Sequence, residues 1–314
     1  MGVHNGLPYL PEAVESILRQ TFADFEFIIV DDGSTDGSGA WLEAKAKEDP
    51  RIRLIRQENI GLTKALNRGL AMARGEFVAR MDADDIALPQ RFEIQVQTLR
   101  DQPDLVLLGS EVEITDEHGW PLIVRGHVAE HAEIRRRLLA GDGGALTHPA
   151  VIFRAEAARA IGGYDERMTT TQDIDFFIRL SEVGRASNVP HVLLRWRQHP
   201  ESSNHRRFGT WADMRRYCIG QTIKRIGVER YLEELFPPMA LGYPRDNLSR
   251  ARWAADQRRY RTAAALYRQA LRTSGQRLSA AQGLCEAALL EANARLWNGL
   301  KRFSSRLKAI LSPR

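Results

Sequence analysis

Long hydrophobic runs are absent from this 314-residue sequence. No apolar stretch approaches the roughly 20 residues that a membrane-spanning helix needs, and the first residues lack the charged-then-apolar layout of a signal peptide. Hydrophobic residues nevertheless make up 43% of the chain, which is enough for a core. We therefore expect a globular, cytoplasmic protein with one domain of ordinary size and a smaller annex.

Cysteine is also scarce. The two cysteines, Cys218 and Cys285, lie far apart in the sequence and have no histidines nearby at metal-ligand spacing. The sequence therefore indicates neither a disulfide framework nor a zinc site. We expect both to be small buried residues.

Acidic and basic residues are unevenly distributed. Residues 206–314 contain 22 Lys and Arg against 8 Asp and Glu, a net charge of +14, whereas residues 1–205 carry −9. An acidic region suits divalent cations, and a basic region suits phosphate, anionic lipid or nucleic acid. A solvated, Arg-rich helical surface explains the basic region equally well.

The first hundred residues alternate between helical and strand patterns. Short apolar runs predict strands at 25–30, 52–55, 77–81 and 105–109. Helical spacing of apolar residues separates them, at 10–18, after Asp36, at 62–73 and at 89–99. This alternation predicts an α/β fold with a mostly parallel sheet flanked by helices on both faces. Ligands of such folds bind at the carboxyl ends of the strands.

The sequence divides into two regions. Strand-like stretches and two helices, near 130–139 and 174–183, complete an α/β domain that we assign to residues 1–205. From residue 206 the composition changes to Ala, Arg, Leu and Tyr, which predicts a separate basic α-helical extension over 206–314, with helices at 254–271 and 287–311. Part of it, Ala263 to Leu271, resembles a tetratricopeptide unit, although no second copy follows at the expected period of about 34 residues.

The first acidic cluster, Asp31-Asp32-Gly33-Ser34, directly follows the strand predicted at 25–30. A carboxylate at that edge of a sheet can accept hydrogen bonds from a base or a ribose. Taken alone, the segment is more often a turn in which Asp and Ser cap the next helix.

A second acidic cluster, Asp82-Ala83-Asp84-Asp85, ends another predicted strand. Side chains two apart on extended backbone point the same way, so we expect Asp82 and Asp84 to face one crevice. Mg²⁺ typically takes one or two protein carboxylates and completes its shell with water and phosphate oxygens. Two acidic clusters, each at the end of a predicted strand, favour a magnesium or manganese site beside a diphosphate over a solvated acidic turn.

Several motifs, taken in their order and spacing, resemble family 2 glycosyltransferases of the GT-A fold over residues 1 to about 205. The resemblance implies a Rossmann-like sheet and the transfer of a sugar from a nucleotide-diphosphate donor, with UDP favoured, to a saccharide or lipid-linked hydroxyl. The matching segments are Val3-His4-Asn5-Gly6, Ser16 to Thr21, Asp31 to Asp36, Asn59-Ile60-Gly61-Leu62, Asn67-Arg68-Gly69, Met81 to Asp85, Thr147-His148-Pro149, Gly162 to Glu166, Thr171 to Asp175 and Arg195 to His199.

The resemblance also implies roles for individual residues. Val3 and Asn5 would lie along the uridine, and Lys64 would approach the donor. Asp31 or Asp32 would read the base. The complete nucleotide-sugar site implied in this way consists of Val3, Asn5, Asp31, Asp32, Ser34, Gly61, Lys64, Asp82 and Ala83.

The same resemblance implies a metal site and a catalytic base. Mg²⁺ or Mn²⁺ would bind Asp82 and Asp84, with His199 as a further ligand, and Asp173 matches the general base. Most members carry Glu-Asp there, and this chain has Gln172-Asp173, which keeps the carboxylate. An inverting transfer needs one base for the acceptor hydroxyl and a metal for the leaving diphosphate. Without the family context, Asp173 would be interpreted as a helix N-cap and His199 as a structural residue.

The N-terminal segment departs from the family pattern. Family members begin with an apolar strand of several residues ahead of the segment that matches Val3-His4-Asn5, whereas this chain starts almost at that strand's end. We expect a central strand to be missing or strongly shortened, which would leave backbone groups of its neighbours without partners. A start codon assigned too far downstream is the preferred explanation, and a truncated paralogue is the alternative.

The last predicted helix has an apolar face beside basic residues. This pattern is typical of a helix that lies in a membrane interface, which would give peripheral contact with the inner face of the membrane near a lipid-linked acceptor. Docking of this face on the preceding helices is the favoured alternative. The face contains Leu289, Leu296, Trp297, Leu300, Phe303, Leu307 and Ile310.

Other functions fit the sequence less well. It lacks the Gly-x-Gly-x-x-Gly and Gly-Lys-Ser/Thr loops of dinucleotide and P-loop enzymes. Asp31-Asp32-Gly33 lacks the Asp-x-Asp spacing of haloacid-dehalogenase phosphatases, and no Gly-rich basic loop of a sugar nucleotidyltransferase is present. We expect no nucleic-acid partner. The remaining alternative is a catalytically impaired family member that serves as a binding or scaffold protein in glycan assembly through its basic extension.

Overall fold

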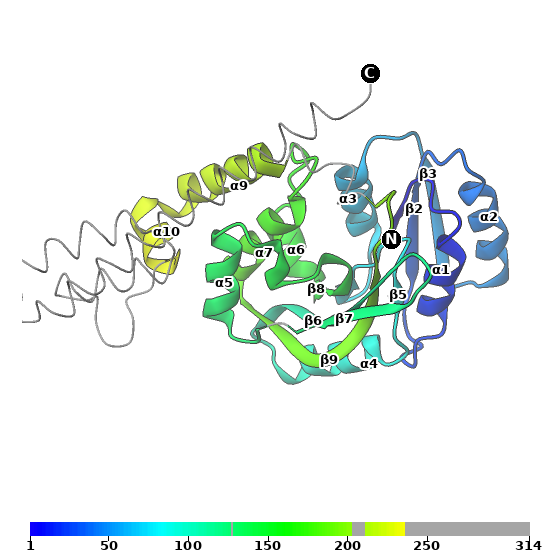
Figure 1. The fold of residues 1–314 in the computed structure, drawn as a ribbon, viewed down its shortest axis with the longest axis horizontal. Helices are drawn as coiled ribbons and strands as arrows, with labels where there is room; N and C mark the ends of the chain where they lie inside the picture. Colours follow the sequence, from blue (N-terminus) through cyan, green and yellow to red (C-terminus); the bar gives the residue numbers. More distant parts are fainter. Residues whose placement is uncertain (127, 203–210, 236–314) are drawn as a thin grey trace, which may run out of the picture. The chain divides into compact units, whose positions relative to one another are not determined.

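The computed structural model describes residues 1–126, 128–202 and 211–235. In this part of the chain two β-sheets lie within one α/β unit, and helices cover them (Figure 1). The predicted alternation of strands and helices over the first hundred residues is confirmed.

The first sheet is fully parallel, in the order β1-β2-β3. Its strands are β1 (Gly2–Val3), β2 (Phe27–Asp32) and β3 (Ile52–Gln57). Three helices connect and cover them: α1 (Leu10–Leu18), α2 (Ser38–Glu48) and α3 (Leu62–Met72). With two residues, β1 is as short as the sequence indicates. Leu10 and Val14 of α1, Ile29 of β2 and Leu42 of α2 are completely buried, because they belong to one hydrophobic cluster between these elements.

The second sheet is mixed, so a mostly parallel arrangement describes only the first sheet. Its order is β4-β8-β6-β9-β5, with β7 also paired to β6. β6 runs parallel to β9 and antiparallel to β7 and β8. A short turn joins β6 to β7, and such a turn can connect only antiparallel strands. The strands are β4 (Phe77–Ala79), β5 (Ile86–Ala87), β6 (Leu105–Thr115), β7 (Pro121–Arg125), β8 (Ile152–Arg154) and β9 (Arg185–Arg197).

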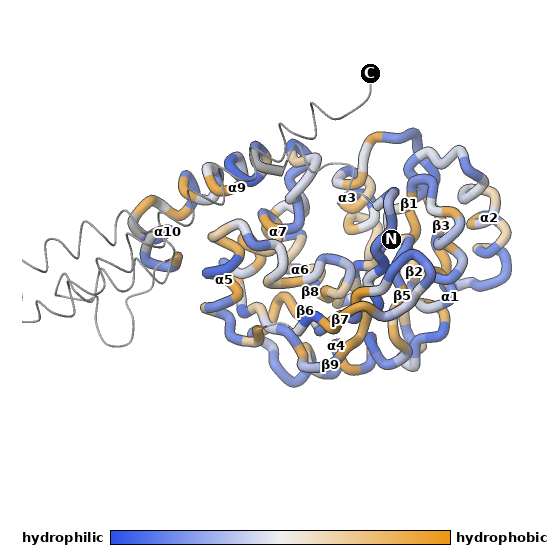
Figure 2. The backbone as a smooth tube through the Cα atoms, viewed as in Figure 1, coloured by the Kyte–Doolittle hydropathy of each residue, from blue (hydrophilic) through white to orange (hydrophobic). Residues whose placement is uncertain are grey.

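Four helices pack around the second sheet, and apolar side chains fill the space between them. Phe153, Phe176 and Leu107 are almost completely buried there. Figure 2 shows the corresponding hydrophobic segments in the strands of this sheet. The helices are α4 (Arg91–Asp101), α5 (His131–Leu139), α6 (Ala155–Ala160) and α7 (Gln172–Val183).

A buried arginine fixes the end of β4. Arg91, at the start of α4, is completely buried, and its Nη2 donates to the backbone oxygens of Arg80 at 2.7 Å and Val151 at 3.2 Å. The backbone N–H of Arg80 donates to the same Val151 oxygen at 2.9 Å. These bonds hold Arg80, which lies two residues ahead of the second acidic cluster.

Two further helices, α9 (Trp211–Ile226) and α10 (Val228–Leu235), pack on α5 and α7. The hydroxyl of Tyr231 donates to the Leu139 oxygen at 2.9 Å, and Arg225 pairs with Glu182. The compact unit therefore extends past residue 205 and includes both helices. Cys218 is buried, as predicted.

The remaining predictions for the C-terminal region fall outside the described residues. They concern Cys285, the helices at 254–271 and 287–311, and the apolar face of the last helix. Among the helices that the structure describes, none is long and apolar enough to cross a membrane.

Candidate active site

The loop after β1 interlocks with the loop after β2. Asn5 adopts a left-handed backbone conformation with φ of 54°, its N–H donates to Ser34 Oγ at 2.9 Å, and its Oδ1 accepts from the Thr35 N–H at 2.8 Å. The Val3 side chain is buried in the core, so only its backbone is available to a ligand. Three residues of the implied nucleotide site, Val3, Asn5 and Ser34, thus come together where β1 and β2 end.

The two carboxylates that end β2 have different surroundings. Asp32 accepts three hydrogen bonds: one from Gln57 Nε2 at the end of β3, at 2.7 Å, and two from the N–H groups of Ile60 and Gly61 in the loop that follows, both at 2.9 Å. Asp31 accepts from the Ser34 N–H at 3.0 Å and lies 3.2 Å from Arg56 Nε. Both side chains are buried. Asp32 therefore fastens the loop that leads into α3.

Replacing Asp32 by alanine is expected to lower the free energy of unfolding by about 2 kcal/mol, because two partly buried backbone N–H groups and one amide lose a charged acceptor. Urea unfolding measures the change. The control is Asp24→Ala at an exposed carboxylate, which is expected to stay within about 0.5 kcal/mol of the unchanged chain. Equal stability of the two variants would contradict a fastening role.

Gly61 and Lys64 lie at the start of α3. Gly61 has φ of 96°, a conformation that favours glycine, and occupies the N-cap position of the helix. Lys64 follows in the first turn, where its side chain is exposed. Both residues are therefore on the rim of the loop that Asp32 holds.

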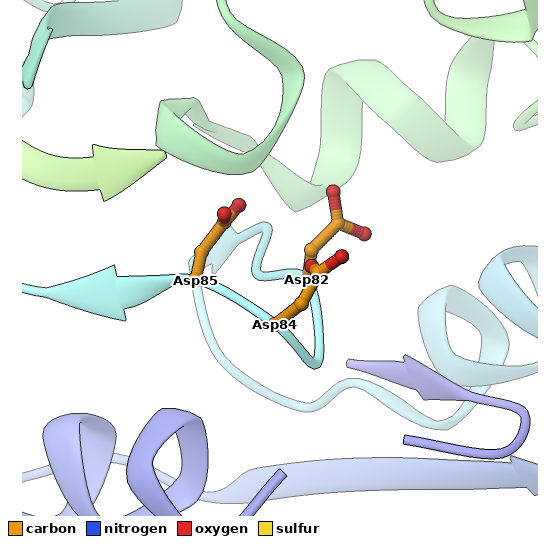
Figure 3. Close-up of side chains that lie close together, drawn as sticks. All are labelled: Asp82, Asp84 and Asp85. Atoms are coloured by element: carbon orange, nitrogen blue, oxygen red, sulfur yellow. The ribbon is translucent and has the colours of Figure 1, made fainter. Parts of the chain in front are cut away.

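The second acidic cluster forms a bend after β4. Carboxylate oxygens of Asp82, Asp84 and Asp85 all lie within 4.8 Å of one another. Figure 3 shows the three side chains pointing to the same side of the loop. The predicted convergence of Asp82 and Asp84 is found, although an irregular bend rather than strand alternation produces it. Ala83 turns towards the loop after β1, where an added Cβ on Gly6 would lie 3.6 Å from it.

Each carboxylate of the acidic cluster has a different partner. Asp82 pairs with Arg80, a buried arginine at the end of β4. Asp84 Oδ2 lies 3.0 Å from His199 Nε2, so the structure brings these two predicted ligands together. Asp85 Oδ1 accepts from the Arg197 N–H at 2.9 Å, which joins the cluster to the end of β9.

The chemistry of this cluster fits a divalent cation. Asp85 is almost completely buried, and its second oxygen, Oδ2, has no hydrogen-bond partner among the described residues. A buried carboxylate oxygen without a donor is unfavourable unless a cation or water binds it. Carboxylate oxygens are the ligands that Mg²⁺ and Mn²⁺ prefer. Asp82 and Asp84 are partly exposed beside it, which leaves access from solvent.

Electrostatics within the cluster favour neutralisation by a cation. Burial raises the pKa of Asp85 well above its usual value, and the charges of Asp84 and Asp82 raise it further. Removal from bulk water also raises the pKa of Asp82, although the neighbouring Arg80 opposes this change. A bound divalent cation would reverse both effects, since it stabilises ionised carboxylates.

The predicted base, Asp173, lies in the first turn of α7. The N-cap position belongs to Thr171, with φ of 58°, so the alternative in which Asp173 is the N-cap is wrong. Burial raises the pKa of Asp173, the charge of Arg80 lowers it, and that of Asp82 raises it. Asp173 thus lies within electrostatic reach of the acidic cluster.

A buried pair of polar side chains adjoins Asp173 and Arg80. His148 Nε2 and the Tyr164 hydroxyl are 2.9 Å apart, and the Tyr164 ring stacks on Phe176 with ring centroids 4.0 Å apart. Burial lowers the pKa of His148 well below its usual value, and the charge of Arg80 lowers it further. The motifs containing His148 and Tyr164 therefore meet in the core beside Phe176 and Phe177 of α7.

Comparison with known sequences identifies the family. The model for Glycosyl transferase family 2 matches residues 1–162. The chain belongs to this family. Putative glycosyltransferase EpsE of Bacillus subtilis is 33% identical to this glycosyltransferase over 213 residues, 66% of this chain and 75% of EpsE. Amylovoran biosynthesis glycosyltransferase AmsE of Erwinia amylovora is 30% identical over 225 residues, 70% of this chain and 83% of AmsE.

Longer relatives also match. Chondroitin synthase of Escherichia coli is 25% identical over 236 residues, 73% of this chain, and this glycosyltransferase spans 32% of its length. Similarity to that protein therefore concerns a part of it only.

Solved structures share the fold of this family 2 glycosyltransferase. S. aureus TarS 1-349 in complex with UDP-GlcNAc has a TM-score of 0.60 at 18% identity, covering 94% of this chain and 90% of that one. Mannosyltransferase PcManGT from Pyrobaculum calidifontis, in complex with GDP-Man and Mn²⁺, has a TM-score of 0.54 at 19% identity, covering 100% and 86%. The predicted GT-A fold is confirmed.

Sequence reasoning missed some of the residues that shape this site. Arg80 and Arg197 are buried arginines that pair with or donate to the acidic cluster, and Asp85 supplies its most buried carboxylate. The sequence did contain one signal for these residues, which is the presence of charged residues beside apolar strand segments. A charge at such a position is expected to be buried, and a buried charge requires a partner.

Proposed function

We propose that this family 2 glycosyltransferase is an inverting enzyme that transfers a sugar from a nucleotide-diphosphate donor to an acceptor hydroxyl. The observation that carries the proposal is the convergence of Asp82, Asp84 and Asp85 at the edge of the fold, within electrostatic reach of Asp173. A single displacement at the anomeric carbon needs one carboxylate base and neutralisation of the leaving group. Both requirements find residues at this site.

The donor is a nucleotide sugar, with UDP as the favoured nucleotide. The loops that meet at Asn5 and Ser34, together with Asp31, offer the base and ribose polar groups at the carboxyl end of the first sheet. TarS is described in complex with UDP-GlcNAc, and PcManGT in complex with GDP-Man. These two complexes support a nucleoside diphosphate sugar as the ligand class and leave the sugar open.

Mg²⁺ or Mn²⁺ is the metal that fits the donor set. Asp82 and Asp84 would hold it, with Asp85 and His199 beside them. Once bound, it would offset the charge that develops on the leaving nucleoside diphosphate. Arg80 holds the Asp82 carboxylate in place through an ion pair. The Arg197 side chain donates to the backbone oxygen of Asp84, and its backbone N–H donates to the Asp85 carboxylate.

Asp173 is the proposed base, which takes the proton from the acceptor hydroxyl as that oxygen attacks the anomeric carbon. Burial raises the pKa of Asp173, which makes it a better proton acceptor than an exposed aspartate. Backbone amides in the first turn of α7 and the charge of Arg80 lower the pKa and so stabilise the ionised form. The buried pair of His148 and Tyr164, which packs on Phe176 of α7, would help to hold the helix that carries this base.

The acceptor is proposed to be a saccharide or a lipid-linked saccharide. AmsE is named for amylovoran biosynthesis, which supports a role in the assembly of cell-envelope polysaccharide. We propose that a cytoplasmic enzyme binds such an acceptor at the inner face of the membrane. The basic extension would provide peripheral contact with that membrane.

The pH dependence of the reaction is expected to reflect the raised pKa of Asp173. The rate requires the ionised base, so kcat/KM is expected to fall as the pH drops through that pKa, with a midpoint above about 3.9, the ordinary value for aspartate. Initial rates between pH 3.5 and 8 measure the profile. Mn²⁺ binding measured over the same pH range distinguishes protonation of the metal site from protonation of Asp173. A midpoint of kcat/KM at or below about 3.9 would contradict the assignment of Asp173 as the base.

Calorimetric titration tests the proposed donor class directly. UDP, UDP-GlcNAc and GDP-Man are titrated into the full chain with and without Mn²⁺. We expect the uridine nucleotides to bind at least tenfold more tightly with Mn²⁺ present, since a cation held by Asp82 and Asp84 would offset the negative charge of the diphosphate. If no nucleotide binds under either condition, the proposed function is wrong.

A further inference from the structure

An apolar strand edge is exposed on the second sheet. β7 pairs with β6 along one edge (Figure 1), and its other edge has no strand beside it in the part of the chain that the structure describes. The large apolar side chains of this strand and of the residue before it form what we call the β7 patch. Their exposed fractions are 71% for Trp120, 63% for Leu122, 62% for Ile123 and 50% for Val124. Together they present on the order of 450 Å² to solvent, a size typical of functional surface patches.

The open edge of β7 determines which kind of partner fits the patch. Alternate residues of an antiparallel strand direct their N–H and C=O groups to one neighbour, so the groups of the other residues point to the open edge. Lipid tails cannot satisfy these groups, whereas another extended strand can. The first four residues of β7 are all exposed, so apolar side chains on both faces of the strand are uncovered. The partner that fits is therefore a strand with apolar side chains.

The hairpin that carries the β7 patch is held in shape by its own turn. Asp116 Oδ1 accepts from the N–H groups of His118 at 3.0 Å and Trp120 at 2.8 Å. The Asp116 N–H donates to the Trp120 oxygen at 3.0 Å, and Arg197 Nη1 donates to the Glu117 oxygen at 2.9 Å. A strand that is ordered before association loses little conformational entropy when it pairs.

We propose that a second copy of this chain pairs with β7, so that the two β7 strands run antiparallel about a two-fold axis beside Ile123. The strand is self-complementary in this arrangement, because Ile123 meets its counterpart and Leu122 lies next to Val124 of the other copy. The two ends of the strand also differ in charge, since Glu117 lies in the turn before it and Arg125 is its last residue. Antiparallel pairing brings the basic end of each strand towards the acidic turn of the other.

The size of the interface predicts a weak dimer that adjoins the acidic cluster. Two β7 patches and the paired strand edges would bury about 1,000 Å², the lower limit for specific protein interfaces. We therefore expect a Kd on the order of 10 μM. Arg197, which donates to the Glu117 oxygen, also donates to the Asp84 oxygen at 2.9 Å. A single side chain thus connects the proposed interface with the acidic cluster.

Sedimentation equilibrium of the full chain tests the proposal, at concentrations from about 1 to 200 μM that bracket the expected Kd. Ile123→Lys places a charge at the two-fold axis. The matched control is Val183→Lys, at an apolar residue of α7 whose exposed fraction is 54%. We expect the unchanged chain and the control to dimerise equally, and Ile123→Lys to weaken dimerisation at least tenfold, because two like charges would lie opposite each other.

Two further measurements locate the contact on β7. Between the lowest and highest concentrations, hydrogen exchange of the residue 122–125 amides that face the open edge is expected to slow about threefold or more. Under oxidation at the highest concentration, Ile123→Cys is expected to form a disulfide-linked dimer, and Val183→Cys is not. The proposal is overturned if the chain stays monomeric or if Ile123→Lys dimerises as tightly as the control. Equal protection of the β7 amides at both concentrations would also overturn it, since the strand would then pair within the chain.

Discussion

Replacement of Asp173 by asparagine is expected to lower kcat by roughly 10² to 10⁴, the range typical of a lost general base. Asparagine keeps the size and the first-turn position of the side chain but cannot accept the proton of the acceptor hydroxyl. Nucleotide release in the presence of acceptor gives the rate, and calorimetry of UDP with Mn²⁺ gives the binding constant. We expect binding to change by less than about threefold, because the base does not hold the donor.

Asp175→Asn provides a matched control for this experiment. Asp175 lies in the same turn of α7, is buried, and pairs with Arg179 at 2.6 Å. Its replacement is expected to reduce stability, since Arg179 loses its charged partner, while kcat stays within about threefold. An Asp173→Asn variant as active as the Asp175→Asn variant would rule out Asp173 as the base.

Loss of the metal site is the second prediction with a large expected effect. Asp84→Asn removes the charge of the carboxylate that contacts His199, and we expect the Mn²⁺ affinity to fall at least tenfold and kcat/KM by about 10³. Mn²⁺ binding followed by electron paramagnetic resonance gives a measure that is independent of turnover. Chelation of the metal from the unchanged chain is expected to stop the reaction, and added Mn²⁺ to restore it.

The control for the metal prediction is Asp101→Asn. Asp101 is an exposed carboxylate at the end of α4 that accepts from Gln97 at 2.8 Å. Its replacement is expected to leave both metal affinity and rate unchanged. If Asp84→Asn binds Mn²⁺ as tightly as Asp101→Asn does, the metal lies elsewhere.

The sequence allowed much of the fold to be predicted, because local patterns determine much of it. The apolar run of β2 and the helical spacing in α1 and α3 are visible without tertiary context. The positions of the two acidic clusters followed from the strands that precede them. The mixed pairing of the second sheet did not follow, since β6 pairs with β8 and β9 over long sequence separations that no local pattern encodes.

The site was predicted less completely than the fold. Asp82, Asp84 and His199 lie together as the family resemblance implies, yet Asp32 already accepts three hydrogen bonds from the end of β3 and the loop that follows it. The sequence did not reveal the pairing of Arg80 with Asp82, because it depends on how a side chain from β4 packs beneath the loop. Buried charge networks are properties of the assembled core and not of any single motif.

The most direct test of the proposed function is release of UDP from a panel of UDP-sugars by the full chain, with Mn²⁺ and with a chelator, alongside Asp173→Asn. We predict metal-dependent release of UDP from at least one donor, and its loss in Asp173→Asn. Binding of UDP and Mn²⁺ without release from any donor, even with saccharide acceptors added, would contradict the account and favour a binding or scaffold protein.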